Sequence, residues 1–205
     1  MPGEDGITSE IFMSLVEILP KYTTAIYNGC LRSGTFPMRW KKAKILPVTK
    51  LGEESRDEVS KFHPVSLLDT GGKVLEKVLI NRINYHVFSQ GFMNKNQYGF
   101  TPQKGTIDAA MAVKTFVKEG LVAGEVIVLV SLNIRGAFDA AWWPGILKEL
   151  RACGCSKNLY ELTKSYFSQC TATLSTNSFR LEKEISRGLA AAQASRIYST
   201  IRCSI

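Results

Sequence analysis

A run of five aliphatic residues at positions 126–130 constrains the fold of this chain more than any other stretch. Its sequence, Val-Ile-Val-Leu-Val, is almost entirely β-branched, which predicts a strand buried on both faces. The polar residues Ser131 and Asn133 follow, Gly136 breaks the extended pattern, and Pro144 suits the first turn of a helix. The simplest interpretation is a core strand and a turn. The alternative is a functional site at the polar end of the strand, a common place for chemistry.

Composition narrows the class of protein. The chain has 205 residues, of which 45% are hydrophobic and 21% charged, as expected for one globular domain, with or without a subdomain. No apolar run approaches the ~20 residues of a membrane span, and the N-terminus does not resemble a signal peptide. We therefore expect a soluble intracellular protein of the cytoplasm, the nucleus or both, with no membrane partner. The net charge of +8 favours a polyanionic partner such as nucleic acid.

The five cysteines do not suggest a metal site. None belongs to a Cys-x-x-Cys pair, and only two histidines could assist them. We expect buried free thiols rather than a zinc site.

Periodicity and capping residues predict the other elements. In chain order we expect a helix capped by Thr8 or Ser9, a helix from Pro20 to a stop at Gly34, a strand at 45–48, a helix from Thr70 to a stop at Gly91, a helix at 107–122 capped by Thr106, two helices around 146–150 and 159–167, and a hairpin of strands 171–174 and 179–181 that turns at Thr176 and Asn177.

Two groups of basic residues leave alternatives open. Lys41, Lys42 and Lys44 precede a short strand, where they could follow a phosphate backbone or protect a solvated edge strand. The basic residues at 73–82 face either water or a template strand.

The polar end of the predicted central strand carries a family resemblance. Residues 131–144 read Ser-Leu-Asn-Ile-Arg-Gly-Ala-Phe-Asp-Ala-Ala-Trp-Trp-Pro. They resemble the first catalytic motif of the reverse transcriptases of non-LTR (LINE-type) retrotransposons, Ser-Leu-Asp-Ile-Lys-Gly-Ala-Phe-Asp-x-x-Trp. The resemblance places Asn133 at the family's metal-binding aspartate, Ile134 at a backbone-carbonyl metal ligand, and Phe138 at the aromatic gate that blocks a ribose 2′-hydroxyl.

Two other stretches extend the resemblance. Residues 61–68 are similar to the family's Tyr-Arg-Pro-Ile-Ser-Leu-Leu segment, which implies a nucleotide-binding role for Lys50 and His63; a displaced nucleotide loop near the C-terminus adds Gln193. Residues 96–106 resemble the family's Asn-Gln-Tyr-Gly-Phe-x-Pro loop beside the template. This second similarity implies four template-binding residues, Gln97, Tyr98, Phe100 and Lys104. Packing under the loop is the alternative role for the two aromatic residues.

The resemblance implies an α+β fold: a partial right-hand polymerase with a palm sheet, helices and a fingers subdomain. The expected regions are a fingers-like one at 1–122 and a partial palm at 123–205, truncated before the second carboxylate motif. The family uses two magnesium ions held by carboxylates. Asn133 supplies no charge, no aspartate follows Asp139, and Asp139 itself should lie beyond the strand tip. We therefore expect no productive magnesium binding.

The expected function is that of a catalytically inactive fragment of an RNA-directed DNA polymerase, with an RNA template and a DNA primer as partners. One alternative is a non-enzymatic nucleic-acid-binding remnant of a mobile element. The other is a chain with no stable function, because its sheet would have an open edge.

Overall fold

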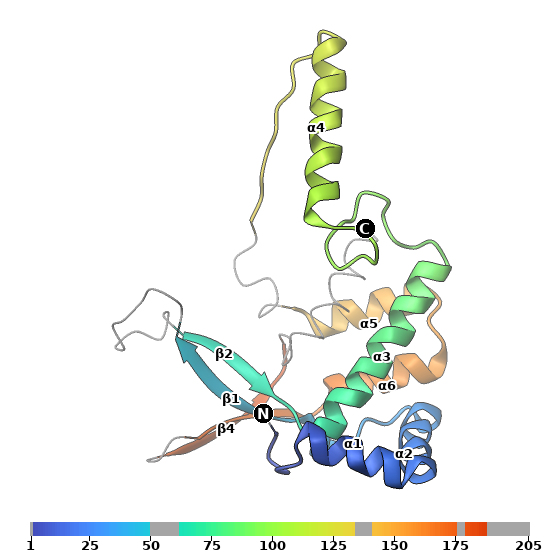
Figure 1. Ribbon diagram of the computed structural model, residues 1–205, viewed down its shortest axis with the longest axis vertical. Helices are drawn as coiled ribbons and strands as arrows, with labels where there is room; N and C mark the ends of the chain where they lie inside the picture. The colour runs from blue at the N-terminus through green and yellow to red at the C-terminus, as the bar shows by residue number, and fades with distance from the viewer. Residues whose placement is uncertain (1, 50–61, 134–140, 176–178, 188–205) are drawn as a thin grey trace.

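The computed structural model describes residues 2–49, 62–133, 141–175 and 179–187 (Figure 1). Within them the fold is mixed α/β, with six α-helices, one short 3-10 helix and a four-stranded sheet. The helices are α1 (Ser9–Ile18), α2 (Pro20–Ser33), η1 (Met38–Lys41), α3 (Thr70–Ser89), α4 (Thr106–Val122), α5 (Trp143–Ala152) and α6 (Lys157–Phe167). The strands are β1 (Lys42–Thr49), β2 (Phe62–Leu67), β3 (Cys170–Ser175) and β4 (Arg180–Ile185). None of these helices is long and apolar enough to cross a bilayer.

The sheet joins two parts of the chain that are far apart in sequence. Its strand order is β2-β1-β3-β4, with antiparallel outer pairs and a parallel central pair in which Lys42 lies opposite Thr171. β1 is therefore an interior strand, which contradicts the alternative of a solvated edge strand protected by lysines. The predicted strands at 171–174 and 179–181 are confirmed by β3 and β4, although their turn at 176–177 lies outside the described residues. The β1–β3 pair links the expected regions 1–122 and 123–205, a division that stays a prediction.

The core forms where α3 crosses α5 and α6. Leu75, Leu79 and Ile83 follow one another at four-residue spacing on α3, and all three are fully buried. This spacing places them on one face of the helix, where they meet Leu150 of α5 and Leu162 of α6 within a single cluster. Burial of each such side chain stabilises the fold by about 1.5–3 kcal/mol.

Local signals set most helix ends. The Thr8 hydroxyl accepts a hydrogen bond from the Ile11 N–H at 3.3 Å, so Thr8 caps α1 as predicted. Gly34 ends α2 in the left-handed conformation (φ 63°), where glycine avoids the cost that a Cβ would impose. A Cβ at Gly34 would also lie 2.8 Å from Cβ of Glu161 on α6. Both the predicted start of α1 and the predicted end of α2 are confirmed.

Two predicted caps are wrong by one residue. Asp69 is the N-cap of α3, and Thr70 instead donates a hydrogen bond from its hydroxyl to the Ile7 carbonyl at 2.6 Å. Gly105 is the N-cap of α4, and its N–H donates to the Asp108 carboxylate at 2.7 Å. In both cases a neighbouring contact outweighs the intrinsic preference of threonine for the cap position.

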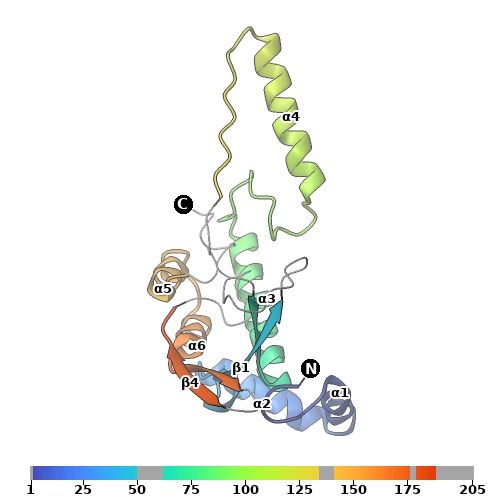
Figure 2. The ribbon, with the colours of Figure 1, turned by 90° about the vertical axis from the view of Figure 1, so that its left-hand side faces the viewer.

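The predicted buried strand at 126–130 is wrong. Residues 125–133 pair with no strand in the described part of the chain, and Val126 and Val128 are 93% and 79% exposed. The segment runs back beside α4, which projects from the rest of the molecule in both views (Figures 1 and 2). Within this segment, Ile127 and Glu125 lie against Gly120 of α4, and the Glu125 N–H donates a hydrogen bond to the Gly120 carbonyl. The physical reason is that β-branched residues favour a strand only where neighbours exist to pair and pack with it.

Candidate nucleic-acid interface

The loop between α3 and α4 is held by hydrogen bonds among its own residues. The Gln97 side-chain amide donates to the Gly99 carbonyl at 2.8 Å, and the Asn96 N–H donates to the Asn94 side chain at 2.9 Å. Phe100 and Gln103 adopt positive φ values of 58° and 62°, which residues other than glycine rarely adopt. The strained backbone persists because the surrounding turns fix it, and such strain is common at binding sites.

All four predicted template-binding residues lie in this loop, and two of them, Tyr98 and Lys104, contact each other. The Lys104 ammonium lies 5.1 Å from the centre of the Tyr98 ring and also donates a hydrogen bond to the Lys95 carbonyl. Gln97 is adjacent in sequence to Tyr98, and both side chains are half-buried. Phe100 keeps 48% of its surface exposed. The loop therefore presents aromatic surface next to a fixed positive charge, a combination that suits base stacking beside a phosphate.

Two lysines that were not predicted from the sequence lie beyond this loop. Lys114 and Lys118 are exposed and one helical turn apart on α4, so they share a face. Their four-residue spacing was the available signal. In Figure 1 the loop leads from the end of α3 into the start of α4, the projecting helix that carries both lysines.

The remaining predicted site residues are only partly described. Asn133 is exposed at the end of the segment that follows α4. His63 lies in β2 opposite Val48, and its side chain is not described. Lys50, Ile134, Phe138 and Gln193 lie outside the described residues, so their predicted roles stay predictions.

The described residues do not fit the magnesium site that the family resemblance implies. In the described ranges, no three His, Cys, Asp or Glu side chains gather where they could hold a metal ion. The exposed Asn133 amide offers an oxygen but no negative charge. Hard divalent cations need carboxylates as ligands and as countercharge, and Asn133 supplies no carboxylate.

The three lysines at the end of η1 and the start of β1 do not form a continuous phosphate-binding row. Lys41 is 4% exposed, and its ammonium donates to the Ser165 carbonyl at 2.8 Å. Burial lowers the pKa of Lys41. Lys42 is exposed and Lys44 half-buried, so Lys42 is the most accessible of the three.

The basic residues of α3 are divided between faces of the helix. Lys73 and Lys77 are one turn apart and lie on the same side. Arg82 is nine residues from Lys73, which at 3.6 residues per turn places it on the opposite side. The predicted basic surface from Lys73 to Arg82 is therefore two separate surfaces.

A buried acid on α3 was not predicted from the sequence. Glu76 lies on the buried face of the helix, and the Tyr166 hydroxyl of α6 donates to its Oε1 atom at 2.7 Å. Its Oε2 atom is buried with no hydrogen-bond partner among the described residues. Burial raises the pKa of Glu76 to about 7, while the Tyr166 hydrogen bond and the charge of Lys73 act in the opposite direction. The position of Glu76 next to Leu75 in an apolar helix face was the only signal.

Comparison with known proteins gives a consistent result. Residues 48–194 match the family model described as reverse transcriptase (RNA-dependent DNA polymerase). The RNA-directed DNA polymerases of the mobile element jockey are 31% identical in Drosophila melanogaster, over 87% of this chain, and 34% identical in Drosophila funebris, over 81%. The Pol polyprotein of the type-1 retrotransposable element R1 of Bradysia coprophila is 30% identical over 91% of this chain. The chain spans only 18–19% of the length of these relatives.

Proposed function

Because the chain belongs to the reverse transcriptase family, we propose that it is part of the RNA-directed DNA polymerase of a non-LTR (LINE-type) retrotransposon and contacts a template strand through residues 96–105. The observation that carries the proposal is the Lys104 ammonium fixed over the Tyr98 ring, in a loop whose Phe100 is exposed. Stacking on an aromatic face tolerates any base, and a nearby cation binds the phosphate.

In this proposal, residues 1–122 form a fingers-like region and residues 123–205 form the first part of a palm-like region. The mixed sheet and the position of the loop before α4 support this assignment. Nucleic acid is the proposed partner, in agreement with the net charge of +8.

Binding to single-stranded RNA tests the role of the loop. We expect the double variant Tyr98→Ala, Lys104→Gln to bind a fluorescent RNA more weakly than the parent by roughly tenfold or more, because it lacks one ring that stacks on a base and one charge that binds a phosphate. The matched control is Tyr22→Ala, Lys148→Gln, which removes an exposed tyrosine and an exposed lysine from α2 and α5. Equally weakened binding in the two variants would contradict the role of the loop.

We further propose that the chain does not catalyse primer extension, since Asn133 replaces the charged metal ligand of the family's first motif. The test is extension of a DNA primer on an RNA template with magnesium, by the parent chain and by Asn133→Asp. No product is expected from the parent, and tighter magnesium binding is expected for the variant, because a carboxylate adds charge at that position. Primer extension by the parent chain would refute the proposal of inactivity.

A second candidate is a non-enzymatic nucleic-acid-binding remnant of a mobile element. The observation that favours it is the combination of the basic loop with the absence of a metal-binding cluster from the described residues. RNA binding without extension, by the parent and by Asn133→Asp alike, would favour this candidate.

A further inference from the structure

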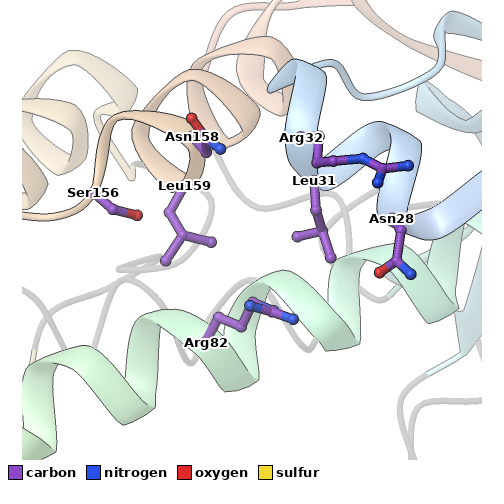
Figure 3. Close-up of a pocket in the computed structure, with 7 residues that line it drawn as sticks. All are labelled: Asn28, Leu31, Arg32, Arg82, Ser156, Asn158 and Leu159. Atoms are coloured by element: carbon purple, nitrogen blue, oxygen red, sulfur yellow. The ribbon is translucent and has the colours of Figure 1, made fainter.

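A hollow of about 360 Å³ lies where α2, α3 and α6 meet, away from the 96–105 loop (Figure 3). Its volume is near the lower end of the range for pockets that bind small ligands. Seven residues line it: Asn28, Leu31, Arg32, Arg82, Ser156, Asn158 and Leu159. No carboxylate is among them.

Two arginines from different helices give the pocket its charge. Arg32 comes from the last turn of α2 and Arg82 from α3, and both side chains are exposed. In the described part of the chain, neither guanidinium makes an ion pair or a side-chain hydrogen bond. Each retains five N–H donors for a ligand, in a planar arrangement that matches phosphate oxygens.

The other lining residues add hydrogen-bond donors and two half-buried apolar side chains. Figure 3 shows Leu31 and Leu159 descending from α2 and α6 toward α3, and both are half-buried. Asn28 and Asn158 supply side-chain amides on the same two helices. Ser156 is the N-cap of α6, and its side chain makes no capping hydrogen bond. The unpaired N–H groups of the first turn of α6 therefore add to the positive potential of this pocket.

We propose that this pocket binds a phosphate group between Arg32 and Arg82. Arg32 and Arg82 line the same pocket and no carboxylate lines it with them, so the potential in the pocket is positive and favours an anion. A phosphate accepts bidentate hydrogen bonds from both arginines, and its remaining oxygen can accept from an amide or from Ser156. The group can be part of a polynucleotide backbone or free in solution. Binding of a polynucleotide phosphate rests on the proposed function, whereas binding of free inorganic phosphate does not.

The experiment uses the 205-residue chain with three probes: inorganic phosphate, a single-stranded RNA and a poly-glutamate peptide. NMR shifts of the Arg32 and Arg82 Nε–H resonances report binding in the pocket, and fluorescence anisotropy reports the affinity for RNA. We expect phosphate, RNA or both to shift the two resonances. A response to RNA alone identifies a polynucleotide as the source, and a response to inorganic phosphate shows that free phosphate suffices. A response to the peptide alone would overturn the proposal, as would no response to any probe.

Charge-matched variants separate a built site from general attraction. Arg32→Gln, Arg82→Gln should abolish phosphate binding and, if RNA is the source, lower the slope of log affinity against log salt by about 0.7 for each phosphate that the protein no longer neutralises. The control Lys148→Gln, Lys183→Gln removes two exposed charges from α5 and β4 and should leave pocket binding unchanged. Equal effects of both pairs would overturn the proposal.

Two further variants separate recognition by guanidinium geometry from recognition by charge alone, and the pocket from the loop. Arg32→Lys, Arg82→Lys keeps the charge but removes the bidentate geometry, so we expect weaker binding with an unchanged salt slope. Full affinity in this variant would contradict recognition by the two guanidinium forks.

Tyr98→Ala, Lys104→Gln should weaken RNA binding through the loop while phosphate still shifts the arginine resonances. The proposed template loop and the phosphate pocket can therefore fail separately.

Discussion

Replacement of Glu76 by glutamine should make the protein more stable at alkaline pH and leave its stability at acidic pH nearly unchanged. The carboxyl group of Glu76 is fully buried between α3 and α6, with one hydrogen bond from Tyr166. Its pKa is raised from the ordinary value of 4.5 to about 7, chiefly by burial. The folded protein therefore binds this proton more tightly than the unfolded chain does.

The direction of the pH dependence follows from this difference. Below pH 4.5 the acid is protonated in both states; as pH rises from 4.5 to about 7, the unfolded chain releases the proton first and stability falls. Each tenfold difference in proton affinity corresponds to about 1.4 kcal/mol, so the full decrease in stability is roughly 3 kcal/mol. A neutral amide at this position keeps the acceptor for Tyr166 and has no proton to release. The variant should therefore avoid this decrease.

Urea denaturation of the parent and of Glu76→Gln at about pH 5 and about pH 8 measures the effect. We expect similar free energies of unfolding at the lower pH and an advantage of roughly 2–3 kcal/mol for the variant at the higher pH. Asp69, whose pKa burial also raises, contributes in the same direction to both proteins and cancels in the comparison. If the two proteins lose stability in parallel between these pH values, ionisation of Glu76 is not the cause.

Three other predictions test packing around the same core. Tyr166→Phe should destabilise the protein by about 1–3 kcal/mol in urea, because both oxygens of Glu76 then lack a hydrogen bond; an unchanged midpoint would contradict the bond at 2.7 Å. Gly34→Ala should lower the free energy of unfolding by about 1–2 kcal/mol or more, because alanine is strained in the left-handed conformation and its Cβ would contact α6. Gly6 has a similar positive φ but open space around it, so Gly6→Ala should lower the free energy of unfolding by less. Cys170 should react with iodoacetamide at pH 8 more slowly than Cys155, because Cys170 is only 6% exposed and burial raises the pKa of its thiol to about 11. Mass spectrometry of the modified peptides measures the two rates, and equal rates would contradict the prediction.

The helices were predictable because their signals are local. The cap at Thr8, the prolines that open α2 and α5 and the glycine that closes α2 act within one turn of the residues they organise. The 96–105 loop was recognised by its resemblance to a contiguous family motif, whereas the contact between Lys104 and Tyr98 within it was not predicted.

Features that depend on distant partners were not predictable. β1 has the sequence of an exposed edge strand, and only its pairing with β3 places it inside the sheet. The run at 126–130 has strong β propensity, but propensity does not specify a neighbour. The pocket between Arg32 and Arg82 likewise depends on how α2 and α3 cross, which no periodic pattern in either helix reveals.

The hydrogen bond between the segment before η1 and the end of α6 also affects how the chain folds on a ribosome. The Phe36 N–H donates to the Ser165 hydroxyl, 129 residues later in the sequence. At a synthesis rate of ~10 residues per second, the segment around Phe36 waits on the order of ten seconds for that partner to be made. During this interval an aromatic side chain that ends 1% exposed has no finished core to enter. The burial of Phe36 is therefore completed only after α6 has been synthesised.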